Sequence, residues 1–269
     1  MAIMALNSAA TGLRALSTAI DVVANNLANA ETDAFKRQRA NFEDLMYQMM
    51  KQPGTTNTQG DVSPSGIYVG LGTRLSNTEL DMTQGSMDNT GGNLDVGISG
   101  NGFFRVKILN TIGDGTGYTR NGTFFLNNLG QLTLGIGDGY TLVPPLTLPT
   151  GATNISIGQD GTVQYIPQGS TKPQTAGQIQ LYQFVNPQGL NLLGGSVYTE
   201  TEASGTALQS KPGENGAGTL LQGFLEESNV DPVKELVTLI KTQRSFELNS
   251  QSIQTADQAL QTIGHLRQG

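Results

Sequence analysis

Hydrophobic residues near the N-terminus recur with a heptad spacing. Between Leu6 and Ala30, apolar side chains are separated alternately by three and four residues, and this spacing over about four heptads is typical of a coiled-coil seam. A simple amphipathic helix packed on its own domain is the alternative. The predicted N-terminal seam, which we expect to mediate assembly, contains Leu6, Ala9, Leu13, Leu16, Ile20, Val23 and Leu27.

A second heptad pattern lies near the C-terminus. Asp231 followed by Pro232 predicts a helix N-cap and a first helical residue. Two helices that each carry one narrow apolar stripe can bury it only against each other or against neighbouring copies, so we expect these termini to become ordered on assembly. The predicted C-terminal seam contains Leu236, Leu239, Phe246, Ile253 and Leu260.

Short alternating segments between the helices predict antiparallel β structure. Asn-Gly and Asp-Gly pairs that favour tight hairpins end at Gly102, Gly122, Gly139 and Gly161. The predicted fold class is therefore α+β, with long terminal helices that pair as a coiled coil, an extended arm, and a central all-β body that is an antiparallel sheet or small barrel. The strand candidates are 94–98, 103–108, 132–136, 155–157 and 179–182.

The same pattern predicts three regions along the chain. Residues 1–33 and 231–269 form the predicted helical domain, residues 34–75 a linker and extended arm, and residues 76–230 the β domain. Within the arm, residues 53–66 are poor in apolar side chains and rich in turn formers. A run of about 14 such residues is unusual inside a compact domain and predicts a functional or disordered segment.

Composition separates the middle of the chain from its ends. The chain has 269 residues and a net charge of −7, and all of this charge lies between residues 53 and 230. An acidic body without a Lys/Arg cluster argues against nucleic-acid binding, which needs several cations on one surface. The local basic run Lys36-Arg37-Gln38-Arg39 is followed by Glu43 and Asp44, so we interpret it as a solvated helix face.

Few residue types suited to catalysis are present. The chain has no Cys and a single His, His265, near its C-terminus. The side chains needed for thiolate chemistry and for typical zinc sites are therefore missing, and only one His could pair with a Ser nucleophile. We predict no catalytic, cofactor-binding or metal-binding residues and no cofactor. We interpret the carboxylate pairs as solvated surface, with a glycosidase-like acid/base pair as the alternative. They are Glu43/Asp44, Glu200/Glu202 and Glu226/Glu227.

The glycine-rich segments 113–117 and 135–139 lack the Gly-Lys-Ser/Thr of a phosphate-binding loop. We interpret them as hairpin turns, with a calcium-binding repeat as the alternative. No stretch approaches the ~18 apolar residues of a membrane span. The N-terminus lacks a basic region and has a short apolar run, so it is a poor secretory signal and predicts another export route.

Residues 24–48 resemble the N-terminal signature of the bacterial flagellar rod and hook family, Ala-Asn-Asn-Leu-Ala-Asn followed by Gly-Phe-Lys-Arg. Ala34 stands where that family usually has Gly. Residues 223–237 and 243–249 are similar to its C-terminal signature, and residues 100–104, 118–122 and 213–218 also resemble the family. The matching N-terminal residues are Asn25, Asn26, Leu27, Asn29, Phe35, Lys36 and Arg37.

The arm indicates which branch of the family is closest. From Tyr47 onward it resembles an insertion typical of distal rod proteins, and hook proteins are longer. A proximal rod paralogue and a hook-type subunit are the alternatives within the family. The residues that carry this likeness are Pro53, Gly54, Pro64, Ser65 and Gly66.

The resemblance implies a hollow helical homopolymer that crosses the periplasm towards the outer membrane and transmits motor torque to the hook. The terminal helices would line the inner tube, the arm would pack between neighbours, and the β body would form the outer wall. Implied partners are other rod proteins, the hook protein, the surrounding ring proteins and the flagellar type III export apparatus. The resemblance implies no cofactor, no nucleic acid and no direct membrane insertion.

Two hypotheses from other classes are consistent with the residues. One is a secreted carbohydrate-active enzyme that uses Glu200 and Glu202 in a cleft of the β body. The other is an autonomous binding module, such as an adhesin, in which the helices form only a dimer.

Overall fold

The computed structural model describes residues 2–54, 64–108, 115–135, 137, 139–149, 151–169 and 172–266. The chain folds as two compact units. The helical unit comprises Met1–Ala28, Gln38–Glu79 and Asp231–Gly269. The β body comprises Asn29–Arg37 and Leu80–Val230.

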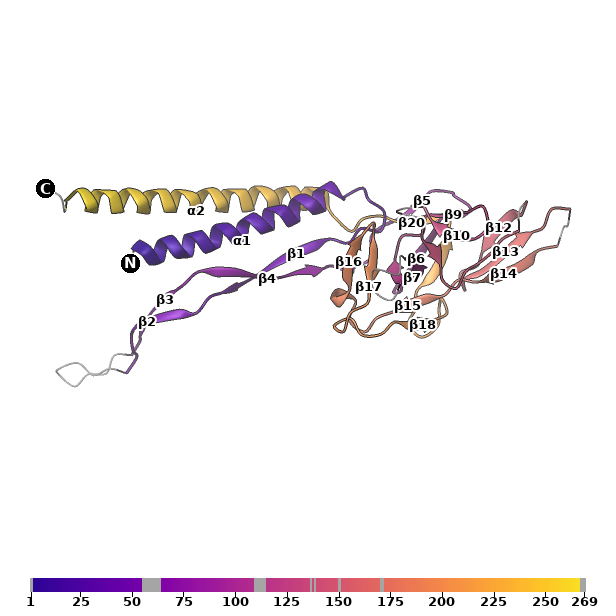
Figure 1. Ribbon diagram of the computed structural model, residues 1–269, viewed down its shortest axis with the longest axis horizontal. Coiled ribbons are helices and arrows are strands. Elements are labelled where there is room, and N and C mark those ends of the chain that lie inside the picture. The colour runs from indigo at the N-terminus through magenta and orange to yellow at the C-terminus, as the bar shows by residue number, and fades with distance from the viewer. Residues whose placement is uncertain are drawn as a thin grey trace. The chain divides into compact units, whose positions relative to one another are not determined.

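The helical unit contains two long antiparallel helices, α1 (Ala2–Ala28) and α2 (Pro232–Leu266), which diverge towards the N-terminus of α1 (Figure 1). The side chain of Asp231 accepts hydrogen bonds from the backbone N–H groups of Val233 (3.1 Å) and Lys234 (3.2 Å). These bonds satisfy donors that a helix start leaves unpaired. The prediction that a helix begins at this Asp-Pro pair is confirmed.

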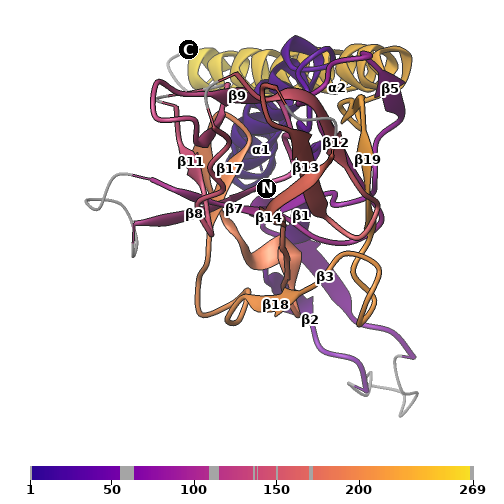
Figure 2. The same cartoon turned by 90° about the vertical axis from the view of Figure 1, so that its right-hand side faces the viewer.

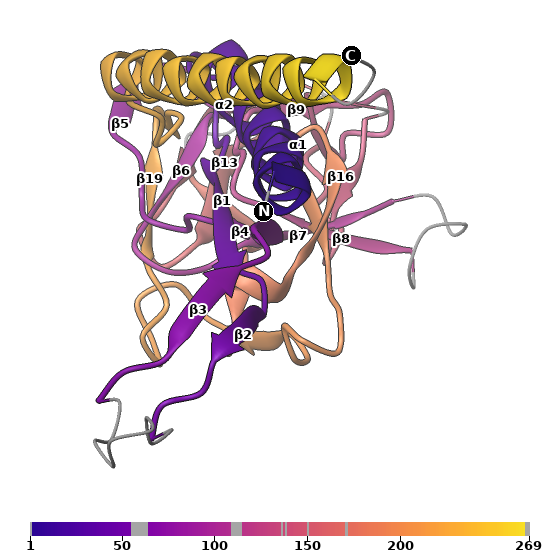
Figure 3. The ribbon, with the colours of Figure 1, turned by 90° about the vertical axis from the view of Figure 1, so that its left-hand side faces the viewer.

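A long β ribbon completes the helical unit (Figure 3). Its two halves are antiparallel pairs, and backbone bonds from Leu45 N–H to Gly72 O (2.9 Å) and from Leu71 N–H to Met46 O (3.2 Å) connect them. Residues 55–63, at the centre of the predicted arm, lie outside the described residues. The pairs are β1 (Gln38–Asp44) with β4 (Thr73–Leu80) and β2 (Tyr47–Lys51) with β3 (Ile67–Gly70).

The β body is built around a seven-stranded antiparallel sheet in the order β16-β17-β8-β7-β11-β10-β9. Hairpins account for much of this order, because β7 pairs with β8, β9 with β10 and β16 with β17. The strands are β7 (Phe104–Lys107), β8 (Thr116–Thr119), β9 (Phe124–Leu126), β10 (Leu132–Leu134), β11 (Thr141–Leu142), β16 (Asn191–Gly194) and β17 (Val197–Thr199).

Smaller antiparallel sheets accompany the main sheet, and Figure 2 shows β12, β13 and β14 side by side. A short 3-10 helix, Pro187–Gly189, precedes β16. The small sheets are β12-β13-β14 (Thr153–Ile157, Thr162–Ile166, Gln174–Gln178), β15-β18 (Leu181–Gln183, Leu208–Ser210), β19-β6 (Thr219–Gln222, Val96–Ser99) and β20-β5 (Phe224–Glu226, Met87–Asn89).

The hydrophobic core lies in the β body, because the alternating strands present their apolar faces to one another. The larger cluster includes the fully buried Phe104 and Phe124, whose rings meet edge to face at 5.2 Å. A second cluster gathers aromatic residues around Phe103, Tyr118 and Tyr198. These clusters give the body an interior of its own.

The α+β class and the antiparallel β-rich body are confirmed. One turn differs from its prediction: Gly102, Gly139 and Gly161 have positive φ, whereas Gly122 does not. Gly122 is required for a different reason, since a Cβ there would lie 1.7 Å from the Val96 carbonyl oxygen. The strands on either side of the predicted hairpin turn at 135–139, β10 and β11, are paired, but residues 136 and 138 and part of the 113–117 segment lie outside the described residues.

Candidate functional site

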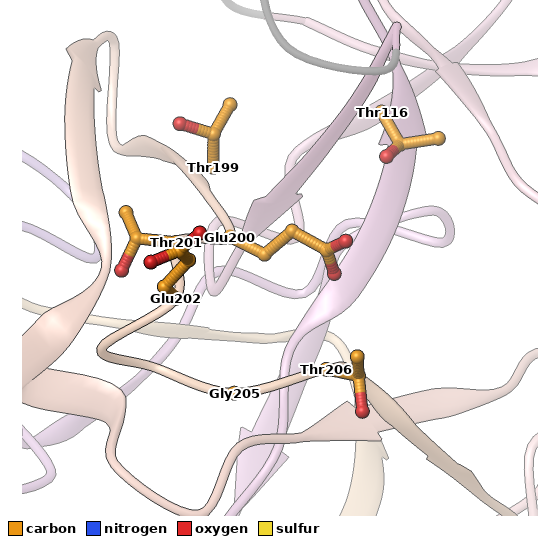
Figure 4. Close-up of a pocket in the computed structure, with 7 residues that line it drawn as sticks. All are labelled: Thr116, Thr199, Glu200, Thr201, Glu202, Gly205 and Thr206. Carbon is orange, nitrogen blue, oxygen red and sulfur yellow. The ribbon is translucent and has the colours of Figure 1, made fainter.

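The carboxylates that suggested catalysis line a hollow of about 630 Å³ together with several threonines. The Glu200 carboxylate extends towards β8, which carries Thr116, and away from Glu202 (Figure 4). Tyr118 donates a hydrogen bond to Glu200 (3.3 Å), and burial, with a smaller contribution from Glu200, raises the pKa of Tyr118 to about 12. Two exposed carboxylates that point apart do not form an acid/base pair.

Other chemistry finds little support in the part of the chain that the structure describes. Within it, no group of three or more His, Cys, Asp and Glu side chains is placed to hold a metal ion. His265 belongs to α2, but its side chain lies outside the described residues. Neither described helix combines the length and hydropathy needed to span a membrane.

A buried ion cluster lies inside the β body. The Glu226 carboxylate accepts hydrogen bonds from Lys36 Nζ (2.6 Å), Arg120 Nε (2.7 Å) and the Gly85 backbone N–H (3.0 Å). The side chains of Lys36 and Glu226 are 0% exposed. Burial lowers the pKa of the Lys36 amine, and the neighbouring Glu226 charge opposes that shift. Two cations therefore share one carboxylate in a low-dielectric interior.

This cluster corrects two interpretations of the sequence. The Lys36–Arg39 run was expected on a solvated helix face, but Lys36 is buried and the chain enters strand β1 at Gln38. Glu226 was expected to be solvated like Glu227, but it is buried while Glu227 is exposed. Both predictions are wrong for one reason: the partners of Lys36 and Glu226 are far apart in the sequence, so neighbouring residues did not reveal the pairing.

Arg120 connects this cluster to the nearby loops. Its guanidinium donates to the carbonyl oxygens of Gly102 (2.9 Å), Gly100 (3.0 Å) and Ile98 (3.4 Å) in addition to Glu226. Arg120 thus uses four of the five donors of its planar guanidinium to hold these loops together. Lys36 extends the cluster in another direction, because its amine also donates to the Thr83 carbonyl oxygen at 2.6 Å.

Asn229 forms a second network in the β body. Its side-chain oxygen accepts from Arg37 N–H (2.7 Å), and its amide nitrogen donates to the carbonyl oxygens of Asp81 (2.8 Å) and Thr83 (3.0 Å). The Asn229 backbone N–H also donates to the Phe35 carbonyl oxygen at 3.4 Å. One side chain thus joins three stretches of chain that are distant in the sequence.

Asn26 has a comparable place in the helical unit. It accepts from Gln38 N–H (2.9 Å) and donates to Gln38 O (2.8 Å) and to the Glu235 carboxylate (3.2 Å). These bonds tie the last turns of α1 to the start of β1 and to the first turns of α2. Asn26 and Glu235 are both buried, so each satisfies the other's polar groups.

Two contacts between α1 and α2 involve small or polar residues. A Cβ at Gly12 would lie 3.3 Å from the Asn249 side chain, and Asn26 bonds Glu235. Ala19, halfway between Gly12 and Asn26, is buried. Gly12, Ala19 and Asn26 each lie one residue before a residue of the predicted N-terminal seam, and we call them the small-residue line. The predicted seam residues Leu6, Ala9, Leu13, Leu16, Ile20 and Leu27 are half-buried, and Val23 is buried.

The residues of the predicted C-terminal seam also differ from one another in exposure. Leu236 is exposed, in company with Val233, Val237, Ile240 and Leu248. These residues form an apolar surface on α2 apart from Glu235 and Asn249, which contact α1. The other predicted seam residues, Leu239, Phe246, Ile253 and Leu260, are half-buried.

The remaining motif residues lie in the last turns of α1 or in the segment that joins α1 to β1. Ala34 has φ 57° and is fully buried, so the turn that favours Gly is present even though Ala occupies it. Its backbone N–H donates to the Glu226 carbonyl oxygen at 2.7 Å. Asn25 is exposed, Leu27 and Phe35 are half-buried, and Asn29 accepts a hydrogen bond from the Thr32 hydroxyl (3.2 Å).

The ribbon that leads into the arm exposes large apolar side chains. Met46 is 82% exposed, and Tyr47, Met49, Ile67 and Tyr68 are each more than half exposed. Among the predicted arm residues, Pro53, Gly54, Pro64 and Ser65 are exposed and Gly66 is half-buried.

Sequence reasoning missed Arg120, Glu226 and Asn229 as a structural centre. A signal was present, because each lies in one of the segments that resemble the flagellar family, and Lys36 lies in another. What the sequence did not provide was their convergence on one place in the β body.

Comparison with known proteins gives consistent matches over most of the chain. Three family profiles match: "Flagella basal body rod protein" at residues 6–36, "Flagellar hook protein FlgE/F/G D1 domain" at 97–165 and "Flagellar basal body rod FlgEFG protein C-terminal" at 221–265.

Several curated relatives are named flagellar basal-body rod protein FlgG. The protein from Buchnera aphidicola subsp. Acyrthosiphon pisum is 44% identical over 257 residues, which cover 95% of this chain and 96% of the relative. That from Caulobacter vibrioides is 43% identical, with 98% and 99% covered. That from Bacillus subtilis is 38% identical, with 97% and 98% covered.

Proposed function

Because this chain belongs to the flagellar basal-body rod family, we propose that its copies assemble into the distal part of the rod as a hollow helical drive shaft that carries motor torque to the hook. The chain is a structural protein of the flagellar basal body and not an enzyme, as its family membership establishes. The carbohydrate-active and adhesive alternatives are therefore set aside.

One observation above all supports assembly through the helices. Gly12 contacts Asn249 and Asn26 contacts Glu235 between α1 and α2. The larger apolar residues flank the small-residue line half-buried, and Leu236 and its neighbours are exposed. An apolar stripe that its own chain does not cover is a candidate contact for another copy. We assign α1 and α2 to a coiled-coil-like inner layer, in which neighbouring copies cover these stripes.

The arm is proposed to pack between neighbouring subunits. An isolated two-stranded ribbon is at best marginally stable, and β2 and β3 expose Tyr47, Met49 and Tyr68. A neighbouring copy that covers these side chains would supply the missing partner. A strut in that position makes sliding between subunits costly, because its packed contacts must break together. We therefore attribute stiffness of the shaft to residues 53–66 and the ribbon that carries them.

The proposed partners follow from the family. They are other rod proteins and the hook protein at the ends of the polymer, ring proteins around it, and the flagellar type III export apparatus. The proposed location is the basal-body rod where it spans the periplasm. The division into a helical domain (1–33 and 231–269), an arm (34–75) and a β domain (76–230) stays a proposal about the assembled rod, and its boundaries differ from those of the compact units, which group residues 29–37 with the β body.

Electron microscopy of the concentrated protein tests this function. We expect hollow tubes for the parent chain, and small oligomers at every concentration would overturn the proposal. A variant that lacks residues 53–66 should still assemble, because both helices and the β body remain, but its tubes should curve. Straight tubes from that variant would place stiffness elsewhere without affecting the role in assembly.

A further inference from the structure

We propose that Asn229 is a mechanical clamp, which makes a load that reaches the β body through one stretch of chain act on three stretches together. The inference rests on the proposed role in carrying torque. It adds the residue that keeps the β body from being peeled open while it does so.

The course of the chain makes such a clamp necessary. Covalent connections between the two units occur at residues 28–29, 37–38, 79–80 and 230–231. A load passed along the backbone therefore enters the β body through three stretches, which we call the entry segment (29–37), the middle segment (80–85) and the exit segment (226–230). If each segment were attached separately, its bonds would break one after another.

Asn229 contacts the backbone of the other two segments directly. It accepts from Arg37 N–H in the entry segment (2.7 Å) and donates to Asp81 O (2.8 Å) and Thr83 O (3.0 Å) in the middle segment. Its amide nitrogen also lies 3.2 Å from the Thr83 hydroxyl. Because these partners are mainly backbone atoms, the contacts do not depend on flexible side chains at the other end.

Backbone bonds between the segments reinforce the clamp. Asp81 N–H donates to Arg37 O (2.8 Å), Asn229 N–H to Phe35 O (3.4 Å) and Ala34 N–H to Glu226 O (2.7 Å). The buried Lys36–Glu226 pair joins the entry and exit segments again. Bonds arranged in parallel among three segments must yield together, which raises the barrier to rupture above that of any single bond.

The chemistry of the position calls for an amide. An amide has both an acceptor oxygen and an N–H donor group, and Asn229 uses both. A carboxylate of the same shape has no donors and would face the carbonyl oxygens of Asp81 and Thr83. Asn229→Asp should therefore open the clamp with almost no change in side-chain volume.

The test is single-molecule force spectroscopy, for which a chain without Cys is well suited. Handles on Ala24→Cys and Asn128→Cys, both exposed positions, pull through the entry segment. Handles on Asn128→Cys and Gln168→Cys pull within the β body. Release of the nine-residue entry segment should add about 30 Å of contour length, which identifies the event.

We expect Asn229→Asp to speed release of the entry segment at constant force by about tenfold or more, and to leave rupture within the β body unchanged. Asn186→Asp is the matched control, since Asn186 is exposed and its amide donates to one carbonyl, Ala203 O, at 3.1 Å. If Asn229→Asp fails to fold, Asn229→Ala, which adds no charge, replaces it.

Equal acceleration in both pulling geometries would show that Asn229 only stabilises the fold, and no acceleration in either would show that it bears no load. Both results overturn the clamp. Tube formation by the parent chain is measured separately, so a failed clamp and a failed rod function give different results.

Discussion

At the scale of single residues, Glu226 is the shared anion of two buried cations, and losing this anion differs from losing one of the cations. Removal of Glu226 leaves Lys36 and Arg120 buried beside each other without an anion. Removal of the Lys36 charge leaves one cation and one carboxylate in contact. Two uncompensated buried cations are far more costly than a lost cation in a cluster that thereby becomes neutral.

We therefore expect Glu226→Gln to lower the free energy of unfolding by about 3–5 kcal/mol and Lys36→Met to lower it by clearly less. Urea denaturation followed by circular dichroism measures both. Glu227→Gln, at the exposed neighbouring position, is the control and should change the value by less than about 0.5 kcal/mol. Equal losses at Glu226 and Lys36 would contradict this account.

Residues also show where sequence reasoning reaches its limit. Glu226 and Glu227 look alike in the sequence, and what separates them is a lysine 190 residues away. Ala34 is a different case: Ala in place of the family's usual Gly put a tight turn there in doubt, yet the backbone adopts a positive φ of 57°. Residue type alone did not decide the local backbone at Ala34, and it did not reveal the long-range partner of Glu226.

At the scale of elements, α1 and α2 come close together at Gly12, which has no side chain. Gly12 leaves room for Asn249, and a larger residue would force the Asn249 side chain to move. The leucines one position further along α1 lie beside the small-residue line and remain half-buried. One face of α1 can therefore contact α2 of the same chain while the adjacent face contacts a neighbouring copy.

Leu13→Asp and Phe246→Asp test the second use of the helices. Burial of an unpaired carboxylate costs several kcal/mol or forces its protonation, so tube formation and motility should be lost. Melting of the β body should hardly change. Ser17→Asp, at an exposed position of α1, is the matched control and should still assemble. A large fall in the melting temperature of the β body would mean that these residues stabilise the body instead.

Elements were predictable where their signals were local. The Asp231–Pro232 start of α2 and the strands around Val96, Phe104 and Leu132 follow from capping and alternation. Hydrophobic spacing alone did not indicate the contacts of Gly12 with Asn249 and of Asn26 with Glu235. A hydrophobic pattern identifies a candidate surface but does not say which copy covers it.

At the scale of the whole molecule, the two units differ in the size of their hydrophobic cores. Both described clusters of buried apolar residues belong to the β body. The helical unit has long elements and many exposed large apolar side chains. Regions that bury little apolar surface open at low free-energy cost, so the helical unit should gain the most from assembly.

Limited proteolysis should reveal this difference. We expect α1 and α2 to be digested in dilute monomer and protected in tubes, while the β body resists in both. Mass spectrometry should find Lys36 and Asn229 in the resistant material, because the entry and exit segments belong to the body. Equal resistance of the helices in monomer and tube would indicate that they need no neighbour.

The backbone bond between Ala34 and Glu226 has a consequence for how such proteins diversify. It brings the first and last stretches of the β body together, and insertions are tolerated best when their two ends lie close. The chain between these two residues contains both the β ribbon and most of the β body. Gene rearrangements could therefore exchange or enlarge this whole span between two fixed points while the flanking helices keep their own sequence, and engineered rods could display foreign domains by the same route.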